Sequence, residues 1–324
     1  MALGIIKHGV TAFCPTLITQ SKANYHQILP KLNKTKGWFK ASILGSHLEG
    51  PFIAKEKRGA HPIEHIQNDI VKSIDEIENF YGNLDDTCII TMAPELDGND
   101  VIRDLTKRGI KVSLGHSMAN LEEARKANKN GANFITHLFN AMLPFHHRDP
   151  GLIGLIAQST PANPVYFGII ADGTHTHQAA LKIAYSSNPH GLVLVTDAIS
   201  ALGLTSGMIH KVGHQMVEIK DGKAFLAGCD TLCGSIASMD ECVRNFNNIT
   251  KCGVVEAVKA ATLHPAQVLG IEKSKGTLNY QSDADFVIMD QNLNILSTFI
   301  NGFLVWKNES ITDSRFLKDW EPDF

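Results

Sequence analysis

The sequence predicts an α/β protein whose parallel sheet forms a (β/α)8 barrel that lacks its first strand, followed by a small C-terminal β module. The first observation is a repeated unit, in which a helical pattern ends at a polar residue and a glycine before a buried strand begins, as at 107–109, 129–131 and 189–191. Glycine supplies the left-handed residue that ends a helix. Because helices and strands alternate, the strands are expected to run parallel in one sheet.

The second observation is that polar residues stand at or just past the carboxyl ends of the apolar runs. These residues are Glu49, Glu95, His116, His137, Asp172 and Asp197. Active sites of (β/α)8 barrels lie at this end of the strands. Histidines and carboxylates on nonadjacent strand ends therefore favour the barrel over the alternative, an open doubly wound sheet of seven strands.

Apolar runs predict seven strands and place helices between them. The strands are expected at 10–17, 41–48, 87–93, 111–115, 133–138, 165–171 and 192–197. The helices are expected at 99–108, 121–130 and 178–187, with Asn120 as the N-cap of the second. An eighth strand is needed to close the barrel, and we expect it to precede Met1.

The pattern changes after Asp197. Alternating residues at 213–219 and 223–227 flank Asp221-Gly222, which predicts a β-hairpin. Helical patterns follow at 239–248 and 254–262. We therefore expect three parts, namely a barrel with its C-terminal helices at 1–275, a small β module at 276–308, and a charged tail at 309–324.

Composition favours a globular protein that acts on small molecules. The 324 residues are 44% hydrophobic and 19% charged, with a net charge of −3 and a pI near 6.6. This charge offers no basic surface for nucleic acid or membranes. The start of the chain is too short for a signal peptide, and six scattered cysteines form no disulfide framework. We expect free thiols and a cytoplasmic location.

Three of the strand-end residues predict a metal centre. Glu49, His116 and His137 are far apart in sequence but would meet at one rim of a barrel. Two histidines and one carboxylate with an open position are typical of a catalytic divalent cation, commonly zinc, which lowers the pKa of bound water. A histidine taken alone is as readily explained by a structural role.

Asp197 is the candidate general acid and base. It follows four apolar residues and a threonine, so it would be held at the rim beside the metal and could exchange protons with water and a leaving group. The alternative is that Asp197 is the N-cap of a helix beginning at Ala198.

Two further groups of polar residues predict substrate contacts. His175, after the strand at 165–171, could donate a hydrogen bond to a developing oxyanion. His146, His147 and Arg148 lie in a loop bracketed by prolines and offer donors for an anionic group, Arg being suited to phosphate. The alternative for this loop is a solvated basic surface.

Several motifs together resemble those of the N-acetylglucosamine-6-phosphate deacetylases of the amidohydrolase superfamily. They occur in the family's order over nearly the whole chain. They are His47-Leu48-Glu49-Gly50-Pro51-Phe52, Arg58-Gly59-Ala60-His61-Pro62, Ser113-Leu114-Gly115-His116-Ser117, Thr136-His137-Leu138-Phe139-Asn140-Ala141-Met142, Ala171-Asp172-Gly173-Thr174-His175 and Val195-Thr196-Asp197-Ala198.

The resemblance implies an amidohydrolase barrel that removes the acetyl group of N-acetyl-D-glucosamine 6-phosphate, releasing glucosamine 6-phosphate and acetate. It implies one divalent metal ion per subunit, zinc being expected, on Glu49, His116 and His137, with Asp197 as the acid and base. It also implies a homodimer in which Arg148 reaches the neighbouring subunit's site. The implied substrate contacts are Ala60, His61, Asn140, Ala141, Arg148, Asp172, Gly173, Thr174, His175, Leu232, Cys233 and Gly234.

Two departures from the family pattern bear on activity. Members begin with part of a β-sandwich and a first barrel strand, so we expect 276–308 to be a sandwich remnant and the shortened barrel to be less active or inactive. Cys233 stands where a serine is expected in many relatives, and a thiol is the weaker hydrogen-bond donor.

Two other functions compete with deacetylation. A catalytically impaired sugar-phosphate binder is motivated by the absent first strand. A cyclic amidase usually needs a His-x-His pair on the first strand and a carboxylated lysine, and neither is found in this sequence.

Overall fold

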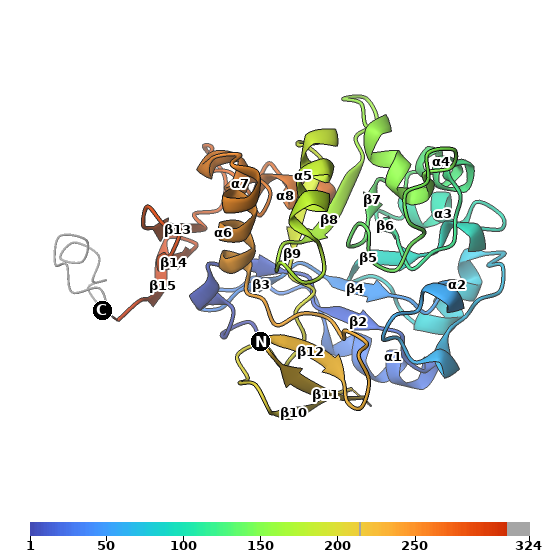
Figure 1. Ribbon diagram of the computed structural model, residues 1–324, viewed down its shortest axis with the longest axis horizontal. Coiled ribbons are helices and arrows are strands. Elements are labelled where there is room, and N and C mark those ends of the chain that lie inside the picture. Colours follow the sequence, from blue (N-terminus) through green and yellow to red (C-terminus); the bar gives the residue numbers. More distant parts are fainter. Residues whose placement is uncertain (214, 310–324) are drawn as a thin grey trace.

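A computed structural model describes residues 1–213 and 215–309 and contains a curled parallel sheet of seven strands (Figure 1). The strands follow one another in the order β2, β4, β5, β6, β7, β8 and β9. They are β2 Thr16–Ile18, β4 Ser46–Glu49, β5 Thr87–Met92, β6 Lys111–Leu114, β7 Phe134–Ile135, β8 Tyr166–Ile170 and β9 Leu192–Val195. A doubly wound sheet reverses its strand order at one point. Since this order never reverses, the barrel topology predicted from sequence is confirmed and the open alternative is wrong.

Two predicted strands are interrupted, for reasons visible in their sequences. The strand expected at 10–17 divides into β1 Ala12–Phe13 and β2 around Pro15, which has no N–H to donate. The strand expected at 41–48 divides into β3 Ser42–Ile43 and β4 around Gly45, whose φ is +126°. β1 and β3 still pair in parallel, in a two-stranded sheet of their own.

Helices follow the strands and lie outside the sheet (Figure 1). The α-helices are α1 Lys22–Ile28, α2 Ile74–Tyr81, α3 Val101–Lys107, α4 Leu121–Lys129, α5 Gln178–Ser187, α6 Met239–Thr250, α7 Val254–Lys259 and α8 Leu263–Leu269. The 3-10 helices are η1 Ile6–His8, η2 Leu29–Lys31, η3 Lys55–Lys57, η4 Ile63–His65, η5 Pro94–Leu96 and η6 Gly151–Gln158. Asn120 caps α4, as predicted, in a capping box with Glu123. Helices α1, α2 and α8 were not predicted from the sequence.

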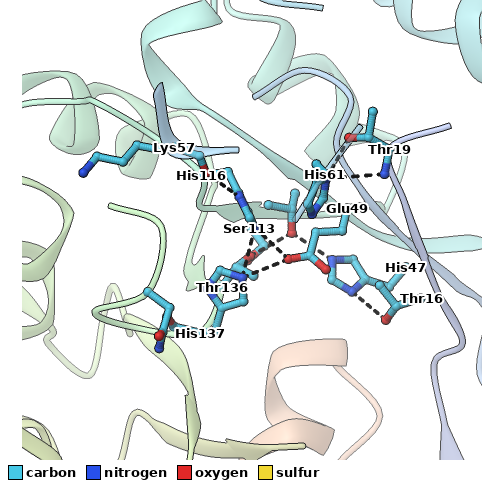
Figure 2. Close-up of polar contacts among 12 residues, drawn as sticks. Thr16, Thr19, His47, Glu49, Lys57, His61, Ser113, His116, Thr136 and His137 are labelled. Atoms are coloured by element: carbon cyan, nitrogen blue, oxygen red, sulfur yellow. Dashed lines mark hydrogen bonds and ion pairs between the residues drawn. The ribbon is translucent and has the colours of Figure 1, made fainter. Parts of the chain in front are cut away.

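The sheet has an apolar outer face and a polar inner one. Outward residues such as Leu48 and Ile90 are fully buried against the helices. On the inner face a chain of hydrogen bonds joins His47 to Thr91 (2.8 Å), Thr91 to Thr136 (2.7 Å) and Thr136 to Ser113 (2.5 Å) (Figure 2). This polar layer lies beneath the carboxyl rim, because His47 is two residues before Glu49 on one strand.

Two antiparallel sheets lie outside the barrel. The first contains the predicted hairpin, β11 Gln215–Lys220 and β12 Lys223–Leu226, together with β10 Ile209–Val212. The second contains β13 Phe286–Met289, β14 Ile295–Ile300 and β15 Phe303–Lys307, within the predicted β module. Thr298 of β14 donates a hydrogen bond to the carbonyl of Ile6 (2.8 Å), which joins this sheet to the start of the chain. Residues 310–324 of the predicted tail lie outside the described residues.

No helix in the described part of the chain has the length and apolarity to cross a membrane.

Candidate metal centre and active site

The strand ends bring the predicted ligands together at one rim of the sheet. Glu49 is the last residue of β4, while His116 and His137 each stand two residues beyond their strands, β6 and β7. All three side chains are buried, with 3%, 4% and 6% of their residues' surface exposed. Parallel strands place their carboxyl ends on one edge, which explains how residues 67 and 88 positions apart become neighbours.

Their ligand atoms form a tight triangle (Figure 2). Glu49 Oε1 is 3.1 Å from His116 Nε2 and 3.0 Å from His137 Nε2, and the two nitrogens are 3.1 Å apart. His116 Nδ1 donates to the carbonyl of Lys57 (2.7 Å), so in the neutral ring the Nε2 lone pair faces the triangle. Two nitrogens facing each other beside a carboxylate fit a divalent cation held between them.

The electrostatics of the triangle also fit a positive charge at its centre. Burial alone would raise the pKa of Glu49, but hydrogen bonds from His116 and His137 hold it well below its usual range. Burial lowers the pKa of His137, but Glu49 outweighs this effect and raises it to about 9. Without a metal ion, Glu49 therefore favours the protonated, positively charged form of His137. A bound cation would supply that positive charge instead.

Three rim residues adopt a left-handed backbone. His116, His137 and Asp197 have φ values of +50°, +24° and +49°, although none is a glycine. Non-glycine residues rarely occupy this region and do so mainly where the surrounding structure requires it, often at functional sites. Each of the three residues turns the chain just beyond its strand, at the rim where their side chains cluster.

Asp197 stands two residues beyond β9 and is half-buried. Burial, followed by the negative charge of Glu49, raises the pKa of Asp197 to about 6, with partial compensation from His137 and His175. No α-helix begins at Ala198, so the alternative N-cap role is wrong. Asp197 thus lies within the electrostatic reach of the triangle.

His61, which the resemblance implied as a substrate contact, lies beside the triangle. Ligand atoms of Glu49, His61 and His116 all lie within 4.8 Å of one another, which makes a second set of potential metal ligands. His61 Nδ1 is 2.7 Å from Thr19 Oγ1 and accepts from the Thr19 N–H (3.4 Å) (Figure 2). The ligand atoms of Glu49, His116 and His137 form the tighter set, with each pair 3.0 or 3.1 Å apart. The two sets share Glu49 and His116.

His175 and Asp172 form a rigid pair after β8. The two side chains are joined at 2.6 Å between His175 Nδ1 and Asp172 Oδ2, and Asp172 Oδ1 accepts the N–H groups of Thr174 and His175 (both 2.8 Å). They border a cavity of about 230 Å³. Its lining also includes the predicted contacts Leu232 and Gly234.

The remaining predicted contacts are spread over three loops. Asn140 and Ala141 follow His137, and Asn140 donates to the carbonyls of His137 (3.4 Å) and Leu138 (3.3 Å). The carbonyl of Ala60 accepts from Gln215 (2.6 Å), which ties its loop to β11. Gly173 has a φ of +76°, with open space where a side chain would stand.

Cys233 is buried beside the rim. Its N–H donates to the carbonyl of Ala224 (3.0 Å), and its thiol lies 4.0 Å from Gln215 Oε1. Burial, with the charge of Asp197, raises the pKa of the Cys233 thiol to about 11. Gly234 is the neighbouring residue, and a Cβ there would come within 2.8 Å of the Asp197 carbonyl oxygen.

Arg148 lies apart from these residues. Residues 144–149 form an exposed loop in which Phe145 keeps 64% of its surface accessible. The Arg148 N–H donates to His146 Nδ1 (3.3 Å), and within the described residues its guanidinium makes no hydrogen bond or ion pair. The structure therefore does not bring Arg148 to the triangle of its own chain.

A curled parallel sheet with an acid and imidazole cluster at its carboxyl rim is typical of barrel enzymes that use a divalent metal. The amidohydrolase family model matches residues 1–305. N-acetylglucosamine-6-phosphate deacetylase of Homo sapiens is 53% identical over 314 residues, which cover 96% of this chain and 76% of that protein. The chain belongs to this family of amidohydrolases.

Solved structures agree with this assignment. The crystal structure of N-acetylglucosamine-6-phosphate deacetylase from Thermotoga maritima has a TM-score of 0.84 and 33% identity, covering 95% of this chain and 82% of that one. A variant of the Mycobacterium smegmatis deacetylase, solved in complex with N-acetyl-D-glucosamine-6-phosphate, has a TM-score of 0.80 and 28% identity, covering 94% and 79%. The family resemblance inferred from the motifs is confirmed.

Proposed function

We propose that this chain hydrolyses the acetamide of N-acetyl-D-glucosamine 6-phosphate to D-glucosamine 6-phosphate and acetate. The observation that carries the proposal is the triangle of Glu49, His116 and His137 with Asp197 beside it. The activity named for the Homo sapiens and Thermotoga maritima relatives supports the choice of substrate. The same relatives do not favour the alternatives of a cyclic amidase or an inactive binder.

We assign one divalent cation per subunit, zinc, to the triangle. Two imidazole nitrogens and one carboxylate oxygen are a common zinc donor set that leaves a position open. When bound, such a cation polarises an amide carbonyl and lowers the pKa of water.

Asp197 moves the proton in this proposal. Its carboxylate takes a proton from the attacking water as the C–O bond forms. It returns that proton to the amine nitrogen as the C–N bond breaks, so the acid and base roles balance over one turnover. Its half-buried position, within the electrostatic reach of Glu49 and His137, supports this role.

His175 stabilises the oxyanion that develops on the acetyl oxygen. The Asp172 carboxylate, 2.6 Å from Nδ1, fixes the orientation of the ring. When the ring carries both protons, Nδ1 donates to Asp172 and Nε2 donates toward the reaction centre. We assign the sugar to contacts with Ala60, His61, Asn140 and Ala141, and to the cavity beside His175 through residues 172–175 and 232–234.

The phosphate is assigned to Arg148 of a second subunit in a homodimer. The exposed loop at 144–149 and the guanidinium's lack of partners within the described residues support an arginine that acts outside its own chain. The six free thiols support a cytoplasmic location.

Acetate release from N-acetyl-D-glucosamine 6-phosphate tests this proposal. Protein stripped by a chelator should be inactive and should recover when zinc is added back, while the unphosphorylated sugar should be a poor substrate. Full activity after verified metal removal would exclude the metal role. Absence of acetate release from the zinc-loaded protein would exclude the deacetylase activity.

A further inference from the structure

Glu95 holds the segment of chain that follows one of the assigned metal ligands. It lies in η5, just beyond the end of β5. Its Oε2 accepts from the Ser117 hydroxyl (2.6 Å) and its Oε1 accepts from the Met118 N–H (2.6 Å). The Ser117 oxygen in turn accepts from the Ala119 N–H (2.9 Å). One half-buried carboxylate therefore binds two successive residues directly after His116.

The turn at His116 has little freedom on its other sides. The His116 carbonyl accepts from the Ala54 N–H (2.8 Å), and the ring donates to the carbonyl of Lys57. A Cβ at Gly115 would come within 2.8 Å of Thr136, so the backbone there is packed closely. The left-handed φ of His116 and these contacts fix the turn up to His116. Beyond it, the Ser117 N–H donates to the carbonyl of Ala141 (3.1 Å), and Glu95 binds the Ser117 hydroxyl and the Met118 N–H.

We propose that Glu95 is a positioning residue for His116, fixing the Ser117–Met118 segment so that the ring points at Glu49 and His137. The inference rests on the proposed metal centre. Glu95 itself is no ligand and touches no reacting atom. Two short hydrogen bonds from one side chain, both 2.6 Å, can hold a turn that local preference opposes.

Zinc affinity of the metal-free chain, measured by competition with a chromophoric chelator, tests the proposal without using activity. Glu95→Ala should weaken zinc binding by roughly tenfold or more, as loss of supporting hydrogen bonds does at metal sites. Glu95→Gln, which can accept from Met118 and donate to Ser117, should restore affinity to within about threefold of wild type. Glu76→Ala is the matched control, because Glu76 also accepts a backbone N–H, that of Lys72 (3.1 Å), away from the rim.

Wild-type zinc affinity in Glu95→Ala would overturn the proposal. So would a Glu95→Gln variant as weak as Glu95→Ala, because charge rather than hydrogen bonding would then be responsible. If Glu95→Ala does not fold, Ser117→Ala removes one of the two bonds and should weaken zinc binding in the same direction, and unchanged affinity there would also overturn it. A wild-type chain that binds no zinc would instead refute the proposed metal centre.

Discussion

Replacing Asp197 by Asn should slow turnover while making the metal-free protein more stable. Burial, and after it Glu49, raises the pKa of Asp197 from 3.8 to about 6. A carboxyl group with a raised pKa binds its proton more tightly in the folded chain than in the unfolded one, so stability falls as pH rises from about 4 through 6. A shift of about two units corresponds to about 3 kcal/mol. Since the side chain is only half-buried, we expect about 1 to 2 kcal/mol.

Asparagine does not titrate, so the Asp197→Asn variant does not lose this stability as pH rises. Thermal unfolding of metal-free protein should give a higher melting temperature for Asp197→Asn than for wild type at pH 8, and the gap should shrink toward pH 5. With zinc, acetate release should fall by at least about 100-fold. Asp75→Asn, which alters an exposed carboxylate of α2, controls for surface charge. Unchanged turnover would remove the acid and base role, and lower stability at pH 8 would refute the electrostatic account.

Three further predictions concern His175, Arg148 and Asp240. His175→Ala should lower kcat by roughly 100-fold or more through loss of an oxyanion donor, with zinc affinity retained; wild-type kcat would argue against that role. Mixing Arg148→Ala with Asp197→Asn protein should recover about a quarter of wild-type activity, because half of randomly paired dimers are mixed and each has one intact site; no recovery would contradict an arginine that crosses between subunits. Asp240→Ala should reduce the free energy of unfolding at pH 7 by about 1 to 3 kcal/mol, as measured by urea titration, since Asp240 accepts from Arg244 (2.8 Å). Burial opposes ionisation of Asp240, but its hydrogen bonds hold its pKa well below the usual range. The contribution of Asp240 to stability is therefore present above about pH 4 and is lost as pH falls. A destabilisation by Asp240→Ala that is equal at all pH values would contradict this explanation.

The sheet and the triangle could be predicted because both depend on patterns that repeat along the chain. Apolar runs marked the seven strands, and the polar residue at each carboxyl end marked the rim. Once the strands are parallel, Glu49, His116 and His137 must share an edge, whatever their separation in sequence. The convergence of the triangle therefore follows from topology, which periodicity predicts well.

The support around the triangle could not be predicted in the same way. His61 approaches His116 because its loop folds back over the rim, held by contacts such as Ala54 with His116, and no periodic pattern encodes them. Glu95 could be recognised as a polar residue at a strand end, but its partners depend on the turn after His116. The missed helix α2 did have a readable signal, because Ser73 and Glu76 have the spacing of a helix N-terminus, and the Ser73 side chain accepts from the Glu76 N–H.

The left-handed backbone at His116, His137 and Asp197 is unfavourable for residues with a side chain, and all three lie at one rim of the barrel. A glycine would satisfy the conformation at each position but would remove the side chain that the chemistry requires. Sequence changes that stabilise this chain should therefore be sought at the opposite, amino-terminal end of the strands. At the rim, greater ease of folding competes with the proposed metal binding and proton transfer for the same residues.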